Sequence, residues 1–176
     1  MTTAILVAIA VMWLPVALLN LGKGEAKGTG AACGFVGACV VISAILQAAV
    51  FKDGFTAGLL FAHGILYLCV SYALLAGLED LRSVGNVSLT VALISTIYMI
   101  LFLTGGPVMP DGKQLVAQSS YLALACAGYA VLTFEVWLAF YGKIGGGVVA
   151  WSLIVWVFVG LWIPSFFLMT AGKLPF

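Results

Sequence analysis

The sequence predicts an all-α integral membrane protein, in which six transmembrane helices form a twisted bundle of three helical hairpins. Three observations predict this fold class. The 176 residues are 64% hydrophobic and only 7% charged, whereas soluble domains carry about 25% charged residues. Six apolar stretches have the length of a membrane span, which takes about 20 residues. No stretch alternates between apolar and polar residues over about ten positions, as the strands of a membrane barrel do.

The six expected spans are separated by short segments that combine charge with Gly or Pro, the residues that end helices. They cover Thr3–Leu21, Thr29–Phe51, Thr56–Leu78, Asn86–Leu103, Val116–Tyr141 and Val148–Ala171. We expect residues 1–176 to form a single six-helix transmembrane domain with both termini on one side. The first stretch has no basic n-region and no cleavage signature, so we expect it to be a helix of the mature protein.

The distribution of Lys and Arg among the loops predicts the orientation in the membrane. The first, third and fifth loops together carry four basic residues, and the opposite side carries three. This difference favours a cytoplasmic position for the first group of loops and termini outside. The residues are Lys23, Lys27, Arg82 and Lys143 on the first side, and Lys52, Lys113 and Lys173 on the other.

The composition excludes several functions. A net charge of +1 offers no basic surface for nucleic acid. The four cysteines form no CxxC pair, and a single histidine rules out bis-histidine haem ligation and a histidine-rich metal site. No nucleophile motif and no phosphate-binding motif is present. We therefore expect neither an enzyme nor a cofactor or metal, and no ATP-driven activity.

The histidine, His63, lies in the apolar stretch FAHGILYLCVSY. Residues three or four apart share a helix face, so His63, Tyr67 and Ser71 form one polar stripe on the third span. An ionisable group at membrane depth usually faces the bundle interior or a water-filled cavity. The stripe favours a pore-lining position. The alternative is a neutral imidazole satisfied by a backbone carbonyl inside the core.

Glu135 is the one acidic residue inside a predicted span. A carboxylate there is costly unless it is paired or hydrated. Its stripe on the fifth span is polar at both ends and apolar in the middle, which suits a path with two wet ends and a dry constriction. The alternative is an interfacial glutamate that reaches water. The stripe runs through Gln118, Tyr121, Gly128, Leu132 and Glu135.

Three tryptophans, Trp13, Trp156 and Trp162, lie deeper than the interface belts that this residue prefers. Deep tryptophans are usually core residues, but several that face one path would form a narrow apolar slot. The second span carries Gly30, Gly34 and Ala38 at four-residue spacing. Small residues at this period let two helices approach closely, in general packing or in an oligomer contact.

Several segments resemble the AmiS/UreI family of amide and urea channels, and the resemblance covers essentially the whole chain. NLGKGEAKGTGAACGFVG resembles the family's first loop and the entry to its second helix. AGLLFAHGILYLCVSYALLAGLED resembles its third helix, and GLWIPSFFL resembles the Trp-Ile-Pro signature of its last helix.

The resemblance implies a six-helix protomer with its own pore, and a homo-oligomer that is a hexamer in a bacterial plasma (inner) membrane. It implies passive passage of urea or short aliphatic amides to a cytoplasmic urease or amidase. By position, Ile9, Trp13, His63 and Tyr67 would line the inner constriction, although the family more usually has Phe where His63 stands.

On the fifth helix the family's tryptophans fall near Ala125, Gly128 or Tyr129, and Leu132 or Thr133, and none of these positions is Trp here. On the last helix the acid-gated members carry a glutamate near Trp156, and Glu135 would supply a comparable carboxylate from the fifth helix. Acid-gated members also have a long histidine-bearing loop between helices two and three. Here that loop is only KDGFT, so this gate is not expected.

Two other functions stay open at this point. One is a proton-coupled secondary transporter for a small solute, with Glu135 or His63 as the proton carrier. The other is a membrane subunit that packs against partners and conducts nothing. The residues do not distinguish urea from acetamide or longer amides.

Overall fold

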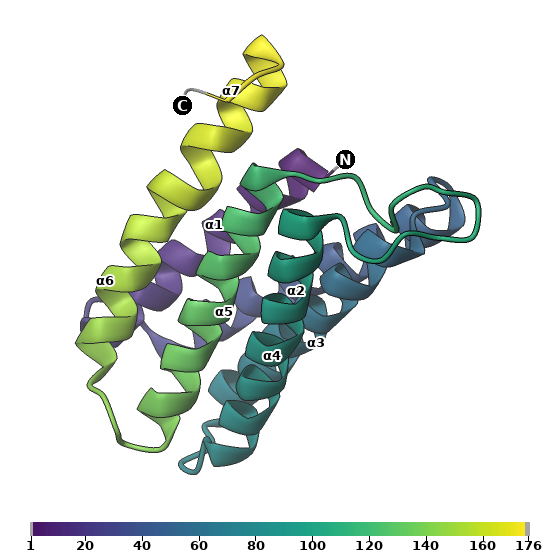
Figure 1. Cartoon of the computed structure of the whole chain (residues 1–176). Helices are drawn as coiled ribbons and strands as arrows, with labels where there is room; N and C mark the ends of the chain where they lie inside the picture. The colour runs from purple at the N-terminus through teal and green to yellow at the C-terminus, as the bar shows by residue number, and fades with distance from the viewer. Residues whose placement is uncertain (1, 175–176) are drawn as a thin grey trace.

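The computed structural model describes residues 2–174, which are helical apart from short loops and one isolated β-bridge (Figure 1). The helices α6, η1 and α7 follow one another without a break, so the chain forms six helical rods. Their bounds are α1 Thr2–Asn20, α2 Ala26–Ala49, α3 Gly54–Ala76, α4 Arg82–Thr104, α5 Ser120–Phe140, α6 Gly146–Trp156, η1 Val157–Trp162 and α7 Ile163–Ala171.

Five of the six rods have the length and hydropathy of a membrane span, and α1 is shorter. The helix has 19 residues. At about 1.5 Å per residue it rises roughly 28 Å, close to the thickness of the hydrocarbon layer. The expected all-α membrane fold with six helices is confirmed.

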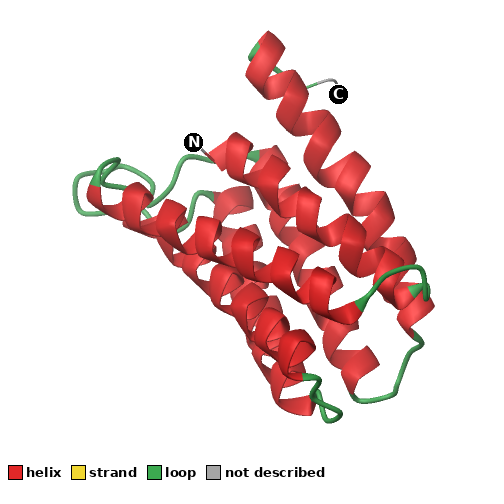
Figure 2. Cartoon of the chain, turned by 180° about the vertical axis from the view of Figure 1, so that it is seen from behind, coloured by secondary structure: helices red, strands yellow, loops and turns green. Residues whose placement is uncertain are grey.

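Two helix starts differ by four residues from the sequence expectation, and the other boundaries differ by three residues or fewer. Helix α4 begins at Arg82, a turn before the expected Asn86. Helix α5 begins at Ser120 and not at Val116, because the Ser119 hydroxyl accepts the Leu122 N–H at 3.2 Å and caps the helix there. The preceding backbone pairs with the end of α4 instead, through Val116 N–H to the Gly105 carbonyl at 3.2 Å. This α4–α5 loop is the longest between the rods (Figure 2).

The rods form a closed ring. Each helix packs against its neighbours in the chain, and α1 also packs against α6, η1 and α7, which joins the end of the ring to its beginning. The α2–α3 and α4–α5 pairs make the most extensive contacts. The first helix begins and the last helix ends at the same end of the bundle, and the α3–α4 and α5–α6 loops lie at the opposite end (Figure 1). We call these ends the terminal face and the distal face.

The glycines of α2 pack against α3. A Cβ added at Gly37 would lie 3.2 Å from the backbone nitrogen of Leu68, and one at Gly34 would lie 2.7 Å from the Ser71 hydroxyl. On α3, a Cβ at Gly64 would lie 3.3 Å from the backbone nitrogen of Val41. The two backbones therefore approach at van der Waals distance, and Gly30, Gly34 and Gly37 of α2 serve a contact within one chain, whereas Ala38 is exposed.

The last rod contains a π-helical segment, η1, just before Pro164. Pro164 has no N–H group and so cannot donate a hydrogen bond to the carbonyl four residues earlier, that of Gly160. The Tyr121 hydroxyl of α5 donates to this carbonyl at 3.3 Å. The Trp156 ring fills the space beside Gly128 and Gly160. A Cβ at Gly128 would lie 2.7 Å from this ring. The rod is thus fixed to α5 at its irregular turn.

Candidate functional site

Two small cavities follow one another inside the ring, each with a volume of about 60 Å³. This is several times the roughly 10–15 Å³ that one water needs. The distal cavity is lined from all six rods, by Met12, Trp13, Val16, Cys33, Leu66, Tyr67, Val70, Ser88, Leu132, Thr133, Val136 and Leu153. The terminal cavity is lined by Leu6, Ile9, Thr56, Leu59, Leu60, His63, Phe102, Leu122, Ala125, Cys126 and Tyr129.

The cavities meet at one level of the bundle. On α1 the lining passes from Ile9 to Met12, on α3 from His63 to Leu66, and on α5 from Tyr129 to Leu132. Each step is three residues, less than one helical turn. The side chains at this level therefore separate the cavities, and we call them the constriction: Ile9, Trp13, His63, Tyr67, Tyr129 and Leu132.

Aromatic rings form the constriction. The Tyr129 ring lies edge-on to Trp13, with centroids 5.0 Å apart, and edge-on to His63, with centroids 4.4 Å apart. Tyr67 stands one turn from His63 on α3, 6.2 Å between ring centroids. These four residues come from α1, α3 and α5, and each is at most 5% exposed. Their rings fill the level between the cavities.

The hydroxyls of Tyr67 and Tyr129 are buried there and have no hydrogen-bond partner within residues 2–174. The other hydroxyls of the distal cavity are already satisfied. Ser88 donates to the Thr133 carbonyl at 2.8 Å, and Thr133 donates to the Tyr129 carbonyl at 2.7 Å. A buried polar group without a partner costs about 1–3 kcal/mol. The two tyrosine hydroxyls are therefore available to a polar molecule that passes between the cavities.

His63 lines the terminal cavity with its ring, but both ring nitrogens have partners. The Nδ1 atom lies 3.0 Å from the Leu59 carbonyl, and Nε2 lies 3.4 Å from the Ser95 hydroxyl of α4. The imidazole is therefore part of the constriction wall and at the same time tied to two helices.

A wider vestibule, with a volume of about 130 Å³, lies next to the distal cavity at the distal face. Val16 and Val70 line both spaces. Asn20 lies at the end of α1 in the vestibule, and its amide donates to the Val16 carbonyl at 2.9 Å. The vestibule, the distal cavity, the constriction and the terminal cavity form one sequence of spaces across the bundle.

Three of the nine candidate pore-lining residues, Ser71, Glu135 and Trp156, line neither cavity. Ser71 faces Gly34 of α2. Glu135 turns toward α6, where the Ser152 hydroxyl donates to one carboxylate oxygen at 3.1 Å and the other oxygen has no partner. Trp156 lies beside Gly128. The other six residues, Ile9, Trp13, His63, Tyr67, Tyr129 and Leu132, meet at the constriction. Gln118 lies in the loop before α5.

Sequence reasoning passed over Ser95, which is completely buried against His63. A weak signal was present on α4. Ser88, Ser95 and Phe102 are seven residues apart and so share a helix face. Ser88 lines the distal cavity and Phe102 the terminal cavity. Ser95 lies between them, at the level of the constriction.

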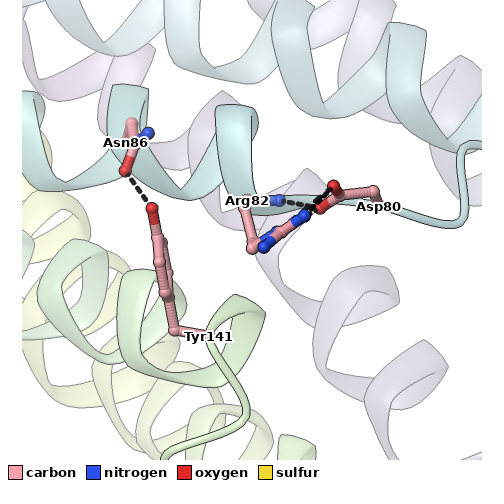
Figure 3. A network of polar contacts seen from close by, with 4 residues as sticks. All are labelled: Asp80, Arg82, Asn86 and Tyr141. Atoms are coloured by element: carbon pink, nitrogen blue, oxygen red, sulfur yellow. Dashed lines mark hydrogen bonds and ion pairs between the residues drawn. The ribbon is translucent and has the colours of Figure 1, made fainter.

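Charged contacts lie at the loops. At the distal face Arg82 pairs with Asp80 at 2.7 Å, and the Tyr141 hydroxyl donates to the Asn86 side chain at 2.8 Å (Figure 3). The hydrogen bonds from Arg82 lower the pKa of Asp80 to about 2. Backbone N–H groups at the start of α2 lower the pKa of Glu25. Burial alone raises the pKa of Asp53, but hydrogen bonds from Thr56 and Gln47 outweigh it, and the pKa is lowered.

Comparison with known proteins gives two findings. Among solved structures, the crystal structure of the urea channel from Helicobacter pylori superposes with a TM-score of 0.81 at 20% identity, covering 99% of this chain and 100% of that chain. A cryo-electron microscopy structure of the same channel in a closed state matches with a TM-score of 0.81 at 21% identity and the same coverage. No match was found among curated protein sequences.

The model of the AmiS/UreI family of transporters matches residues 1–172, nearly the full chain. The structural matches show the same six-helix fold over the whole length. A membrane transporter of this kind is not an enzyme, in agreement with the absence of catalytic motifs from the sequence. The chain is a multi-pass membrane protein that belongs to the AmiS/UreI family of transporters.

Proposed function

We propose that this protein is a passive channel for short-chain aliphatic amides, urea or both, which a cytoplasmic amidase or urease consumes. One observation carries the proposal: two small cavities in single file meet at an aromatic constriction with two free hydroxyls, Tyr67 and Tyr129. The channel of the matched solved structures is a urea channel by its description.

The free energy of permeation supports this function. Moving an amide from water into hydrocarbon without hydrogen bonds costs about 4–8 kcal/mol. Each hydrogen bond to a tyrosine hydroxyl recovers roughly 1 kcal/mol net, and the faces of the aromatic rings suit a planar amide. An ion in the same space meets a Born cost of tens of kcal/mol. The constriction therefore favours small neutral molecules over ions.

The apolar wall of the distal cavity bears on the choice of solute. Leu66, Leu132 and Leu153 line the distal cavity together with Tyr67. An aliphatic amide would place its polar head at the hydroxyls and its alkyl part against these side chains. Urea has no alkyl part, so it would leave N–H groups facing an apolar wall. We therefore place short aliphatic amides before urea.

The assembly and orientation belong to the same proposal. We place one pore in each protomer, since the spaces lie within the ring of a single chain. A hexamer in a bacterial plasma membrane, with the termini outside, follows from the family resemblance and from the four basic residues of the distal-face loops against three.

The test is stopped-flow light scattering on liposomes that contain the purified protein, with acetamide, butyramide, urea and water as permeants. We expect amide permeability well above that of protein-free liposomes, with no effect of an uncoupler. Liposomes whose amide permeability equals that of protein-free controls would contradict the proposal and favour a subunit that conducts nothing.

A proton-coupled transporter is the second candidate, because Glu135 keeps one carboxylate oxygen without a partner. The carboxylate lies outside both cavities, so we expect Glu135→Gln to retain most passive amide flux. The glutamine still accepts the Ser152 hydroxyl. Uptake against a gradient that collapses with an uncoupler, and is absent in Glu135→Gln, would support the transporter instead.

A further inference from the structure

We propose that Ser95 and His63 form a positioning pair, which holds the Tyr129 ring in place and thereby sets the size selectivity of the constriction. The inference rests on the proposed function, because it concerns the solutes that pass Tyr129. Ser95 itself lines neither cavity. Its role is to act on the solute path through His63.

The hydrogen bonds assign the tautomer of His63. A backbone carbonyl only accepts, so the contact of Nδ1 with the Leu59 carbonyl at 3.0 Å requires the proton on Nδ1. The Nε2 atom of the neutral ring then carries a lone pair, and the Ser95 hydroxyl at 3.4 Å must donate to it. The ring is thus held from α3 on one edge and from α4 on the other.

Both partners of the second bond are buried. The His63 side chain is 3% exposed, and Ser95 is fully buried. With both nitrogens engaged, His63 has no hydrogen-bonding atom left for a passing amide. It therefore serves as a fixed wall and not as a binding group.

Tyr129 depends on that wall. Its hydroxyl has no partner, so packing alone fixes the ring and hence the position of the hydroxyl. His63 is the nearer of its two edge-on neighbours, at 4.4 Å between centroids, and Trp13 is the other, at 5.0 Å. An imidazole released from Ser95 can rotate, and Tyr129 then gains room to move aside. The constriction widens without the loss of any lining residue.

The functional test is a double-mutant cycle on the ratio of butyramide to acetamide permeability. We expect Ser95→Ala to raise this ratio about fivefold, the size of effect that one hydrogen bond gives. The ring of phenylalanine has no nitrogen that could accept a hydrogen bond from Ser95. In the His63→Phe background, Ser95→Ala should therefore change the butyramide-to-acetamide ratio by less than about twofold. Thr96→Val is the matched control, because the Thr96 hydroxyl bonds only to the Ala92 carbonyl of its own helix.

Two results would overturn the inference: an unchanged ratio in Ser95→Ala, or an equal rise in both backgrounds. A merely structural role for Ser95 would lower thermal stability in both backgrounds without changing the ratio. Parent protein that passes no amide would instead contradict the proposed function.

A second measurement does not depend on transport. The chain has one histidine, so ¹⁵N spectra of histidine-labelled protein in bilayers report on His63 alone. We expect the Nδ1–H tautomer, with an Nε2 resonance that moves in Ser95→Ala and stays in place in Thr96→Val. Observation of the Nε2–H tautomer in the parent would overturn the pairing.

Discussion

Helix α3 contributes to two regions of opposite character. Toward α2 it presents Gly64 and Leu68, and the two backbones lie within van der Waals distance. Toward the ring interior it presents His63 and Tyr67, whose rings hold the neighbouring helices apart. We call the first region the α2–α3 seam. The second is the constriction.

The difference follows from the bilayer as solvent. Lipid is as apolar as leucine, so helices associate through close packing, which glycine allows and larger residues prevent. Aromatic rings cannot pack as closely from three helices at once, and cavities remain on both sides of them. The seam therefore holds the fold together, and under the proposed function the constriction lies on the solute path.

The two regions also differ in polar groups. The constriction keeps two buried hydroxyls, those of Tyr67 and Tyr129, without partners. A native protein tolerates such groups where they have a function. Substitutions in the seam should therefore affect stability, and substitutions in the constriction should affect flux.

The largest effect is expected in the seam. Gly37→Val and Gly64→Val each place carbon atoms against the backbone of the facing helix, which side-chain rotation cannot relieve. We expect a loss of about 1–3 kcal/mol or more in stability, typical of overpacked cores. It would appear as a lower melting temperature of the purified protein and a lower yield.

Gly54→Val is the matched control, because Gly54 is on α3, like Gly64, and nothing lies within 4 Å of the position that a Cβ atom would take. If Gly37→Val and Gly64→Val melted at the parent temperature, close packing would not hold the seam together.

An intermediate effect is expected in the constriction. Tyr67→Phe and Tyr129→Phe remove one hydroxyl each and keep the rings. We expect each to lower acetamide permeability about fivefold, since one hydrogen bond contributes roughly 1 kcal/mol. The melting temperature should not fall, because neither hydroxyl has a protein partner. The measurement is the stopped-flow assay described above.

Tyr72→Phe serves as the control for these variants. Tyr72 lies on the outer side of α3 and is 67% exposed. The acetamide permeability of Tyr72→Phe should match that of the parent. Equal losses in all three variants would show that the hydroxyls at the constriction have no special part in permeation.

The smallest effect concerns pH. Amide flux should be nearly constant between about pH 5 and pH 8, because the α2–α3 loop is short and histidine-free. The pKa values of Glu25, Asp53 and Asp80 are all lowered in the folded protein. Their contacts therefore stabilise the fold above the ordinary carboxyl range and are lost only as the pH falls through the lowered values.

The measurements are acetamide flux and melting temperature across this range. A steep rise in flux on acidification would show an acid gate somewhere in the chain. A fall in melting temperature only below about pH 4 would agree with the lowered carboxyl pKa values.

Part of the constriction could be predicted from the sequence, and part could not. His63 and Tyr67 share a helix face and do meet there. Ser71 continues the same four-residue spacing, but each such step advances about 40° around the helix. Two such steps place Ser71 about 80° from His63 around α3, where it faces α2. Glu135 is six residues from Tyr129, about 120° away around α5, and it faces Ser152 of α6.

The start of α5 shows a similar limit. Val116 continues an apolar run, so hydropathy alone extends the helix to it. The Ser119 cap and the pairing of Val116 with Gly105 decide otherwise, and that pairing joins residues of the loop to the end of α4.

By itself the sequence determined the membrane class, the number of rods, the charged loops between them and the residues that share each helix face, because hydropathy and the 3.6-residue period are local properties. Only the tertiary structure decided which neighbour covers each face. The ring order turns Gly64 to α2 and His63 to the interior, and it brings Ser95 of α4 to His63. These contacts join residues far apart in the chain, and no local pattern specifies them.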